Sequence, residues 1–286
     1  MSSCITTLNS SSKTVDISRN KPTVMIGERI NPTGRKIVLE AIENGNFDIV
    51  RQDAVAQVEA GARVLDVNAG VPGADEEKLL PRVIEEVMSV VDVPLCIDTA
   101  NPAALEAALK QYPGKALINS TNGEERNLKV ILPLAKRFGA AIIGLCMDES
   151  GIPGTAEARV AVAKKIIDRA RNYDIPIEDI VIDPLALTMS SDHTAGQVTL
   201  ETMALVRDEF GVNITLGASN VSFGLPDRKF INATFIALGI QVGLTCPITN
   251  PLVTEIRTAV MATDLALGKD QDCMRWIKDY RSRQTQ

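Results

Sequence analysis

The chain has 286 residues, a formal net charge of -6 and 45% hydrophobic residues, and only 3% of its residues are aromatic. This length is typical of one (β/α)8 barrel, and an aliphatic composition suits parallel strands that are buried beneath helices. The acidic balance, without a long basic run, argues against nucleic-acid binding. No apolar run approaches the ~20 residues of a membrane-spanning helix, so we expect no membrane span.

The first twenty residues are rich in Ser and Thr and lack the apolar core of a signal peptide, so residues 1–20 are predicted to be a flexible tail. Five cysteines, an odd number without a C-x-x-C pair, argue against a disulfide framework or a zinc knuckle. Reduced thiols favour a cytoplasmic protein. Cys96, Cys146 and Cys246 lie on predicted strands, where small buried hydrophobes are the simplest interpretation.

Short apolar runs alternate with stretches of helical period along the chain. Strands are predicted at residues 23–30, 62–68, 95–98, 116–122, 140–147, 180–183, 213–220 and 244–248. Helices are predicted at about 47–60, 75–91, 102–111, 125–138 and 156–172, then in a stretch ending at 210, and at 229–241 and 253–267. This alternation predicts an α/β fold, a single (β/α)8 TIM barrel over residues 21–268, followed by a C-terminal helical extension, 269–286.

Asp98 ends the third predicted strand, and Asn101-Pro102 opens the next helix. Taken alone, Asp98 is explained equally well as a helix cap. The same layout recurs, however, at the ends of the other strands, which carry Glu28, Asp66 or Asn68, Asn119, Asp148, Asp183, Asn220 and Asn250. Because a barrel directs all strand ends to one face, these side chains are predicted to form a ring of carboxylates and amides at the active-site mouth.

The ring contains no lysine or cysteine nucleophile, which argues against Schiff-base chemistry. A metal site would need a larger share of carboxylate or histidine ligands. Here amides are numerous, and the sole histidine, His193, lies in a predicted loop. We therefore predict no metal site. Carboxylates that accept and amides that donate or accept hydrogen bonds suit a neutral, nitrogen-rich heterocycle.

Six short motifs then fall in order at strand-sized spacing: MIGERIN at 25–31, LDVN at 65–68, IDT at 97–99, INSTN at 118–122, IDPL at 182–185 and GASNVS at 217–222. Over about residues 24–267 the chain resembles the methyltetrahydrofolate–corrinoid methyltransferases and the folate domain of cobalamin-dependent methionine synthase. The resemblance implies a dihydropteroate-synthase-like barrel that holds a pterin in its mouth.

By motif position, the resemblance implies that Asp98, Asn119 and Asp183 bind the aminopyrimidine edge of the pterin and that Asn220 lies by N5. Asp98 and Asn220 are the predicted catalytic residues. The predicted pterin site is completed by Glu28, Asp66, Asn68 and Arg228. Arg228 matches a family loop position that contacts or gates the pterin, although a solvated surface arginine explains it almost as well.

The expected reaction moves a methyl group between a corrinoid and N5 of tetrahydrofolate, in a direction that the sequence does not decide. N5 is expected to be polarised through Asn220, with water and a nearby carboxylate, rather than by a dedicated acid. The chain has no cobalamin module, so cobalamin is expected on a separate corrinoid protein that contacts the mouth transiently, or as free cofactor. The loop around Asp192 and His193 resembles a D-x-H-x-x-G cobalt-binding loop only weakly, because the Asp is one position too close. Family likeness also implies a homodimer.

Two alternatives remain open. A dihydropteroate synthase shares the barrel and the pterin pocket, but would be expected to carry a Ser-Arg-Lys group near the seventh and eighth strands, where this chain reads GASNVS. A non-catalytic folate-binding subunit of a demethylase complex would bind tetrahydrofolate without methyl exchange.

Overall fold

The structure is a computed structural model that describes residues 4–284. Within these residues, eight parallel strands close into a barrel in the order β10-β3-β4-β5-β6-β7-β8-β9. The predicted (β/α)8 barrel is confirmed. Its strands are β3 (Ile26–Ile30), β4 (Val64–Asn68), β5 (Leu95–Asp98), β6 (Leu117–Asn122), β7 (Ala141–Leu145), β8 (Ile180–Asp183), β9 (Asn213–Gly217) and β10 (Cys246–Thr249).

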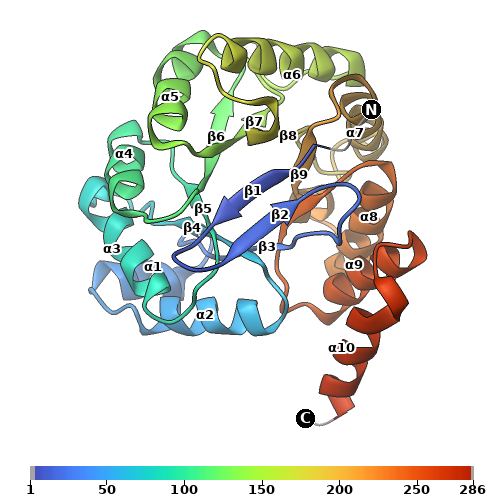
Figure 1. Ribbon diagram of the computed structural model, residues 1–286, viewed down its shortest axis with the longest axis horizontal. Helices are drawn as coiled ribbons and strands as arrows, with labels where there is room; N and C mark the ends of the chain where they lie inside the picture. Colours follow the sequence, from blue (N-terminus) through green and yellow to red (C-terminus); the bar gives the residue numbers. More distant parts are fainter. Residues whose placement is uncertain (1–3, 285–286) are drawn as a thin grey trace.

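Helices surround the barrel, each packed against its neighbours in chain order (Figure 1). They are α1 (Lys36–Glu43), α2 (Asp48–Glu59), α3 (Glu76–Met88), α4 (Pro102–Gln111), α5 (Glu125–Phe138), α6 (Ala156–Arg171), α7 (Ala195–Phe210), α8 (Arg228–Val242) and α9 (Thr254–Ala266). Three short 3-10 helices, η1 (Ile177–Asp179), η2 (Ala218–Ser222) and η3 (Gln271–Cys273), join them. No helix in the described part of the chain is long and apolar enough to cross a membrane.

Side chains of the strands alternate between two apolar layers, because successive residues of a strand point to opposite faces. The outward residues pack under the helices in a large aliphatic cluster that includes Leu65, Ile97, Ile118 and Ile182. The inward residues fill the barrel with a second cluster, made of Ile26, Val64, Cys96, Leu117, Ala141, Ile143, Val181, Cys246 and Ile248. The barrel is therefore packed through its middle, and space for a ligand is left only towards the strand ends.

The N-terminal segment differs from the sequence-based expectation. Residues 6–17 are not a flexible tail but an antiparallel hairpin of β1 (Thr6–Asn9) and β2 (Thr14–Ile17). Leu8, Val15 and Ile17 alternate with polar residues, and they pack into the inner cluster of the barrel. In Figure 1 the hairpin crosses the near end of the barrel. Threonine is β-branched, like valine and isoleucine, and such residues favour strands. The residues whose composition suggested a tail therefore form a hairpin that covers this end of the barrel.

Polar contacts fix this hairpin to the barrel. The Asn213 side-chain amide donates to Thr6 Oγ1 and to the Ile17 carbonyl, both at 2.9 Å. The Tyr112 hydroxyl donates to the Asn9 carbonyl at 2.8 Å. At Gly114, a Cβ would lie 2.0 Å from the same carbonyl oxygen, so only glycine permits this approach.

The C-terminal extension is helical as far as it is described, with α10 (Met274–Gln284) projecting from the barrel (Figure 1). Asp264, which is fully buried, accepts hydrogen bonds from Thr23 N at 2.8 Å and from Arg275 Nη1 at 3.1 Å. This carboxylate ties the first residues of the barrel to the extension. Residues 1–3 and 285–286 of the expected tail and extension lie outside the described residues.

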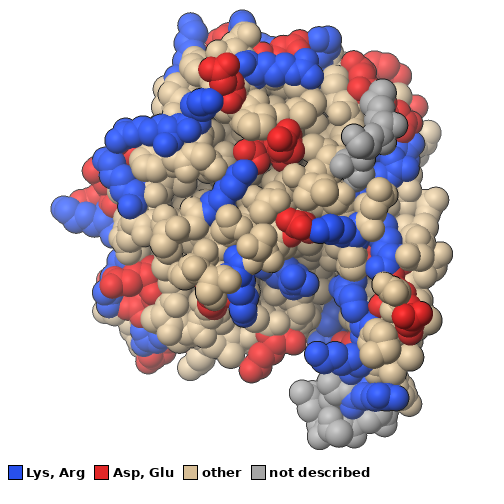
Figure 2. Space-filling model, viewed as in Figure 1, with Lys and Arg blue, Asp and Glu red and all other residues tan. Residues whose placement is uncertain are grey.

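Two further differences concern the loops. Residues 36–43 form α1, where the sequence indicated a loop, and the predicted seventh strand ends at Gly217 and continues as η2. Asn220 therefore lies on a 3-10 turn beyond the strand. Figure 2, in the same view as Figure 1, shows charges of both signs interspersed around the end of the molecule that carries the hairpin.

Candidate active site

The predicted ring of polar residues is positioned by strand alternation. Each of five residues lies two positions after an inward-facing apolar residue of the same strand, so its side chain also points into the barrel. These residues are Glu28, Asp66, Asp98, Asn119 and Asp183. Because they follow the apolar layer, they lie at the carboxyl ends of the strands, where barrel enzymes bind their substrates.

Four of the predicted residues form two hydrogen-bonded pairs on neighbouring strands, which we call together the mouth quartet: Asp66, Asn68, Asp98 and Asn119. In the strand register Asn68 pairs with Asp98, and Asp98 pairs with Asn119. The Asn68 amide donates to Asp98 Oδ2 at 3.0 Å, and the Asn119 amide donates to Asp66 Oδ1 at 3.0 Å. Each amide thus holds one carboxylate oxygen. The side-chain carbonyl oxygen of Asn68 accepts from Gly70 N at 2.8 Å, and the amide of Asn119 keeps a second N–H for another partner.

Both carboxylates of the mouth quartet hold protons more tightly than usual. Burial raises the pKa of Asp66, and the neighbouring charge of Asp98 raises it further. Burial also raises the pKa of Asp98, against the hydrogen bond from Asn68. A buried pair of carboxylates at close range favours one shared proton over two charges. The quartet can therefore accept hydrogen bonds from ring N–H groups and also retain a proton.

A cavity of about 280 Å³ opens beside the quartet. It is lined by Asp98, Thr99, Ala100, Pro102, Asn119, Ser120, Thr121, Asn122, Asn127, Val130, Ile131 and Leu145. The Thr121 hydroxyl is buried and has no hydrogen-bond partner within the described residues. Asp98 and Asn119 are the predicted site residues that share this cavity.

Asp183 is 6% exposed at the end of β8. The Leu185 N–H donates to Asp183 Oδ1 at 2.7 Å, and Leu185 adopts a left-handed conformation with φ 64° that a leucine rarely takes. Burial raises the pKa of Asp183 to about 6, against the hydrogen bonds from the backbone of Leu185 and Gly217. The carboxylate is thus ionised at neutral pH while being almost wholly removed from water.

Asn220 and Arg228 belong to a second group at the mouth, centred on η2. Asn220 is exposed, and its side-chain amide makes no hydrogen bond within residues 4–284. The Ser219 hydroxyl donates to Glu28 Oε1 at 2.9 Å, and burial raises the pKa of Glu28. Arg228 donates to the Ser219 carbonyl at 2.6 Å and to Ser222 Oγ at 3.0 Å. Arg228 therefore braces the turn that presents Asn220.

Other polar residues of the predicted ring bond within their own loops. Asp148 accepts from the Ser150 hydroxyl at 2.6 Å, and Asn250 accepts from Leu252 N at 3.1 Å. His193 is exposed before α7 and lines a groove on the outer face of α7 and α8. Among the described residues, no three His, Cys, Asp or Glu side chains form a group that could hold a metal ion.

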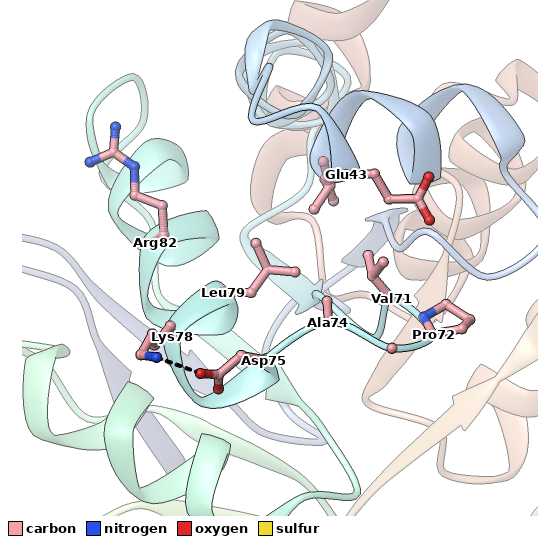
Figure 3. A pocket seen from close by; sticks show the side chains of 10 residues that line it. Glu43, Val71, Pro72, Ala74, Asp75, Lys78, Leu79 and Arg82 are labelled. Atoms are coloured by element: carbon pink, nitrogen blue, oxygen red, sulfur yellow. Dashed lines mark ion pairs between the residues drawn. The ribbon is translucent and has the colours of Figure 1, made fainter.

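Another cavity, of about 500 Å³, lies beside α1, the loop after β4 and α3 (Figure 3). Its charged wall includes the ion pair between Lys78 and Asp75, at 2.7 Å. None of the predicted site residues lines it, so the candidate site remains the mouth of the barrel.

Two polar residues of the mouth were not singled out from the sequence. Ser219 connects to Glu28 across 191 positions, and Asn122 accepts from Glu124 N at 3.0 Å and from the Asn127 amide at 2.9 Å. Both lie inside motifs that the sequence showed, GASNVS and INSTN. The partner of Ser219 follows from the closure of the barrel, whereas the partners of Asn122 lie two and five positions further along the chain and form a local turn at the start of α5.

A closed (β/α)8 barrel with acids and amides at its strand ends defines a barrel enzyme whose substrate enters the mouth. The chain belongs to the pterin binding enzyme family, whose sequence model matches residues 27–250. This finding confirms the family that the six motifs indicated.

The chain is 32% identical over 261 residues to a methylcorrinoid:tetrahydrofolate methyltransferase of Eubacterium limosum, and the match covers 90% of this chain and 96% of that relative. It is 30% identical over 244 residues to a methionine synthase of Mycobacterium leprae. That match covers 80% of this chain but 20% of the synthase, so the chain spans about a fifth of that relative.

Solved structures show the same fold. The Yersinia pestis dihydropteroate synthase in complex with a pterine-sulfa conjugate superposes with a TM-score of 0.68 over 92% of this chain and 98% of that one, at 19% identity. The Thermus thermophilus dihydropteroate synthase superposes with a TM-score of 0.63 over 91% of this chain and 99% of that one, at 22% identity. At such identities the likeness shows the fold alone.

Proposed function

We propose that this protein is a methyltransferase that moves a methyl group between a corrinoid and N5 of tetrahydrofolate. The observation that carries the proposal is the likeness to the Eubacterium limosum methyltransferase along nearly the whole of both chains. The mouth of the barrel supplies the chemistry that such a substrate requires. The dihydropteroate synthases, in contrast, share the barrel at identities of 19% and 22%.

The aminopyrimidine edge of the pterin is expected to face Asp98, Asn119 and Asp183. That edge carries a 2-amino group and a ring N–H, which are donors, and a carbonyl, which is an acceptor. Ionised Asp183 accepts from the donors, and the amide of Asn119 can donate to the carbonyl oxygen. Asp66 accepts from the amide of Asn119, and Asn68 donates to Asp98, so these two residues fix the side chains that face the pterin.

Asn220 is the residue proposed to lie by N5, because its amide is exposed at the mouth and has no partner in the described chain. When folate is methylated, the N5 lone pair forms a bond to the methyl carbon and the methyl–corrinoid bond breaks, with its electron pair leaving on the corrinoid as cob(I)alamin. N5, which is then positively charged, loses its proton. An amide can orient and polarise N5 by hydrogen bonding but cannot take that proton. Glu28, bonded to the adjacent Ser219, is the carboxylate placed to exchange it through Ser219 or water.

The corrinoid is proposed to arrive on a separate protein that contacts the mouth transiently. Nothing in the described chain resembles a second domain that could hold it. We also propose a cytoplasmic location, which suits the five cysteines, all free thiols in the structure.

A homodimer is proposed through the outer face of α7 and α8. Phe230 and Leu238 are 54% and 49% exposed there, and they border an apolar groove together with Met189 and Phe235. A neighbouring groove on the same helices is lined by Leu200 and Val242. Exposed apolar patches of this kind are common at interfaces between protein subunits.

The decisive experiment is a spectroscopic assay of methylcobalamin conversion to cob(I)alamin on addition of tetrahydrofolate, with and without the protein. Conversion that depends on the protein supports the proposal. Tetrahydrofolate binding without conversion would instead indicate a folate-binding subunit. Condensation of a pterin pyrophosphate with aminobenzoate, without methyl exchange, would indicate a dihydropteroate synthase.

A further inference from the structure

Arg159, in the first turn of α6, is among the largest side chains that are fully buried in the described chain, with 1% exposure. Its guanidinium donates to backbone carbonyls from two loops. Nε donates to the Pro153 carbonyl at 2.9 Å, and Nη1 donates to the carbonyls of Pro184 at 3.1 Å and Leu185 at 2.8 Å. Nη1 also lies 3.3 Å from Thr199 Oγ1 of α7.

A buried cation usually faces a carboxylate, because removing a charge from water is costly. Within the described residues Arg159 has no ion pair, and its hydrogen-bond partners are backbone carbonyl oxygens and the Thr199 hydroxyl. An apolar residue at this position would avoid the cost of burying the charge. Filling space is therefore a weak explanation for an arginine here.

Arg159 donates hydrogen bonds to the loop that follows Asp183. Leu185 is the residue with φ 64°, and this conformation directs its N–H to Asp183 Oδ1 at 2.7 Å while its carbonyl accepts from Arg159. A left-handed leucine persists only where its surroundings impose that conformation. The hydrogen bond from Arg159, together with the Thr199 hydroxyl that lies 3.1 Å from the same carbonyl oxygen and shares its one hydrogen with the Ala195 carbonyl, supplies that constraint.

We propose that Arg159 is a positioning residue for folate binding, which holds the 184–185 loop so that the Leu185 N–H and the buried positive charge keep the Asp183 carboxylate oriented and ionised. The proposal rests on the proposed function, because it concerns the residue expected to bind the pterin edge. Arg159 itself does not line the mouth cavity described beside the quartet.

The electrostatic surroundings of Asp183 agree with this role. Burial raises the pKa of Asp183, whereas the charge of Arg159 and the N–H groups of Leu185 and Gly217 oppose that rise. The other titratable groups facing Asp183 are the thiols of Cys146, after β7, and Cys246, on β10. Burial raises the pKa of both thiols, so they stay neutral at neutral pH. Arg159 is thus the one positive charge acting on Asp183 among the described residues.

The test is a titration of the Asp183 carboxyl carbon by NMR in the folate-free protein, assigned with Asp183→Asn, for wild type, Arg159→Met and Arg159→Lys. Arg159→Met should raise the titration midpoint by about one pH unit, since both the charge and the loop contact are lost. Arg159→Lys should raise it less, because the ammonium keeps the charge but cannot hold two carbonyls as a planar fork does. Ile166→Val, a buried change in the same helix, controls for general loosening and should leave the midpoint unmoved.

Tetrahydrofolate affinity, measured by titration calorimetry at pH 7, is the second readout. It should fall about twofold in Arg159→Met, because a midpoint raised by one unit from about 6 leaves about half of the carboxyl ionised at pH 7, and further to the extent that the carboxylate loses its orientation. The loss should be smaller in Arg159→Lys, and the affinity of Ile166→Val should stay near wild type. An unchanged midpoint in Arg159→Met, or the same shift in Ile166→Val, would overturn the proposal. If Arg159→Met does not fold, a wild-type midpoint and a wild-type affinity in Arg159→Lys would overturn the proposal. Wild type that titrates as expected but binds no tetrahydrofolate would count against the proposed function and not against the link from Arg159 to Asp183.

Discussion

Asn220 and the buried carboxylates of the mouth differ in their exposure and in their hydrogen-bond partners. The carboxylates are held by amides or backbone N–H groups, whereas the amide of Asn220 is exposed and unbonded within the described chain. A held residue suits binding in a fixed geometry. A residue with free hydrogen-bonding capacity suits a group whose charge changes during the reaction.

Asn220→Ala is therefore expected to lower kcat more than it raises KM for tetrahydrofolate. Loss of one polarising hydrogen bond at the reacting atom costs about 2–4 kcal/mol, or roughly 30- to 1000-fold in kcat. Steady-state kinetics of methylcobalamin demethylation measure both parameters. Asn44→Ala, on the surface after α1, is the matched control. A rise in KM with unchanged kcat would move Asn220 from catalysis to binding.

Asp183→Asn is expected to weaken tetrahydrofolate binding by roughly 10- to 100-fold, because hydrogen bonds to a charged group are worth about 1.5–3 kcal/mol. Titration calorimetry at pH 7 gives the dissociation constant. The neighbouring backbone N–H groups can still donate to the Asn carbonyl, so the fold should tolerate the change. A dissociation constant equal to that of wild type would remove Asp183 from the pterin site.

The same variant carries a prediction about pH. The pKa of Asp183 is raised from 3.8 to about 6, so the folded state holds this proton more tightly than the unfolded chain. Its contribution to stability is present below pH 3.8 and is lost as pH rises through about 6. Urea unfolding of the folate-free protein should therefore show a decline of up to about 3 kcal/mol from this group between pH 4 and 8, which Asp183→Asn abolishes. Asp192→Asn, at an exposed carboxylate, should keep the whole decline, whereas Asp183→Asn should keep only the smaller part that comes from the raised pKa values of Asp66, Asp98 and Glu28. A decline in Asp183→Asn as large as that of wild type would contradict the assignment.

At the scale of elements, the barrel strands were predictable because Val, Ile and Leu runs recur between helices at regular spacing. The sequence placed Asp66, Asp98 and Asp183 at the ends of their strands, and the structure shows that they share the inward face with Val64, Cys96 and Val181. Asn220 was placed at the end of a strand, whereas it lies on η2, because the turn after Gly217 has no distinctive local composition. The pairings Asn119–Asp66 and Ser219–Glu28 join different strands or loops, so only the closed barrel reveals them.

The hairpin of β1 and β2 was missed because each strand has only four residues and three threonines lie among them. Its apolar positions are obvious only once the barrel end that they fill is known. The structure gives this element a role in stability that composition did not indicate.

Leu8→Ala is expected to lower the free energy of unfolding by about 2–5 kcal/mol, since Leu8 is fully buried in the inner cluster of the barrel. Ile5→Ala, three positions earlier and 45% exposed, is the control and should cost far less. Urea denaturation followed by circular dichroism gives both values. Equal losses in the two variants would show that the hairpin does not contribute to the core.

At the scale of the whole molecule, the proposed dimer makes a separate prediction. Phe230→Asp should convert a dimer to a monomer, because it places a charge on the exposed apolar surface at the start of α8. Size-exclusion chromatography with light scattering measures the mass. Val130→Asp, on α5 at 44% exposure, should leave the mass unchanged. A wild-type protein that is monomeric at high concentration would refute the proposed interface.

The hairpin and the inner apolar cluster also determine the route by which substrates enter and leave the site. The inner apolar cluster fills the middle of the barrel, and Leu8 and Ile17 cover its other end, so the site opens only at the carboxyl ends of the strands. A large carrier seated over that opening confines whatever lies inside. Folate must therefore bind before the proposed corrinoid protein docks, and it can be released only after that protein has dissociated. We expect ordered sequential kinetics in which folate is the first substrate to bind and the last product to leave.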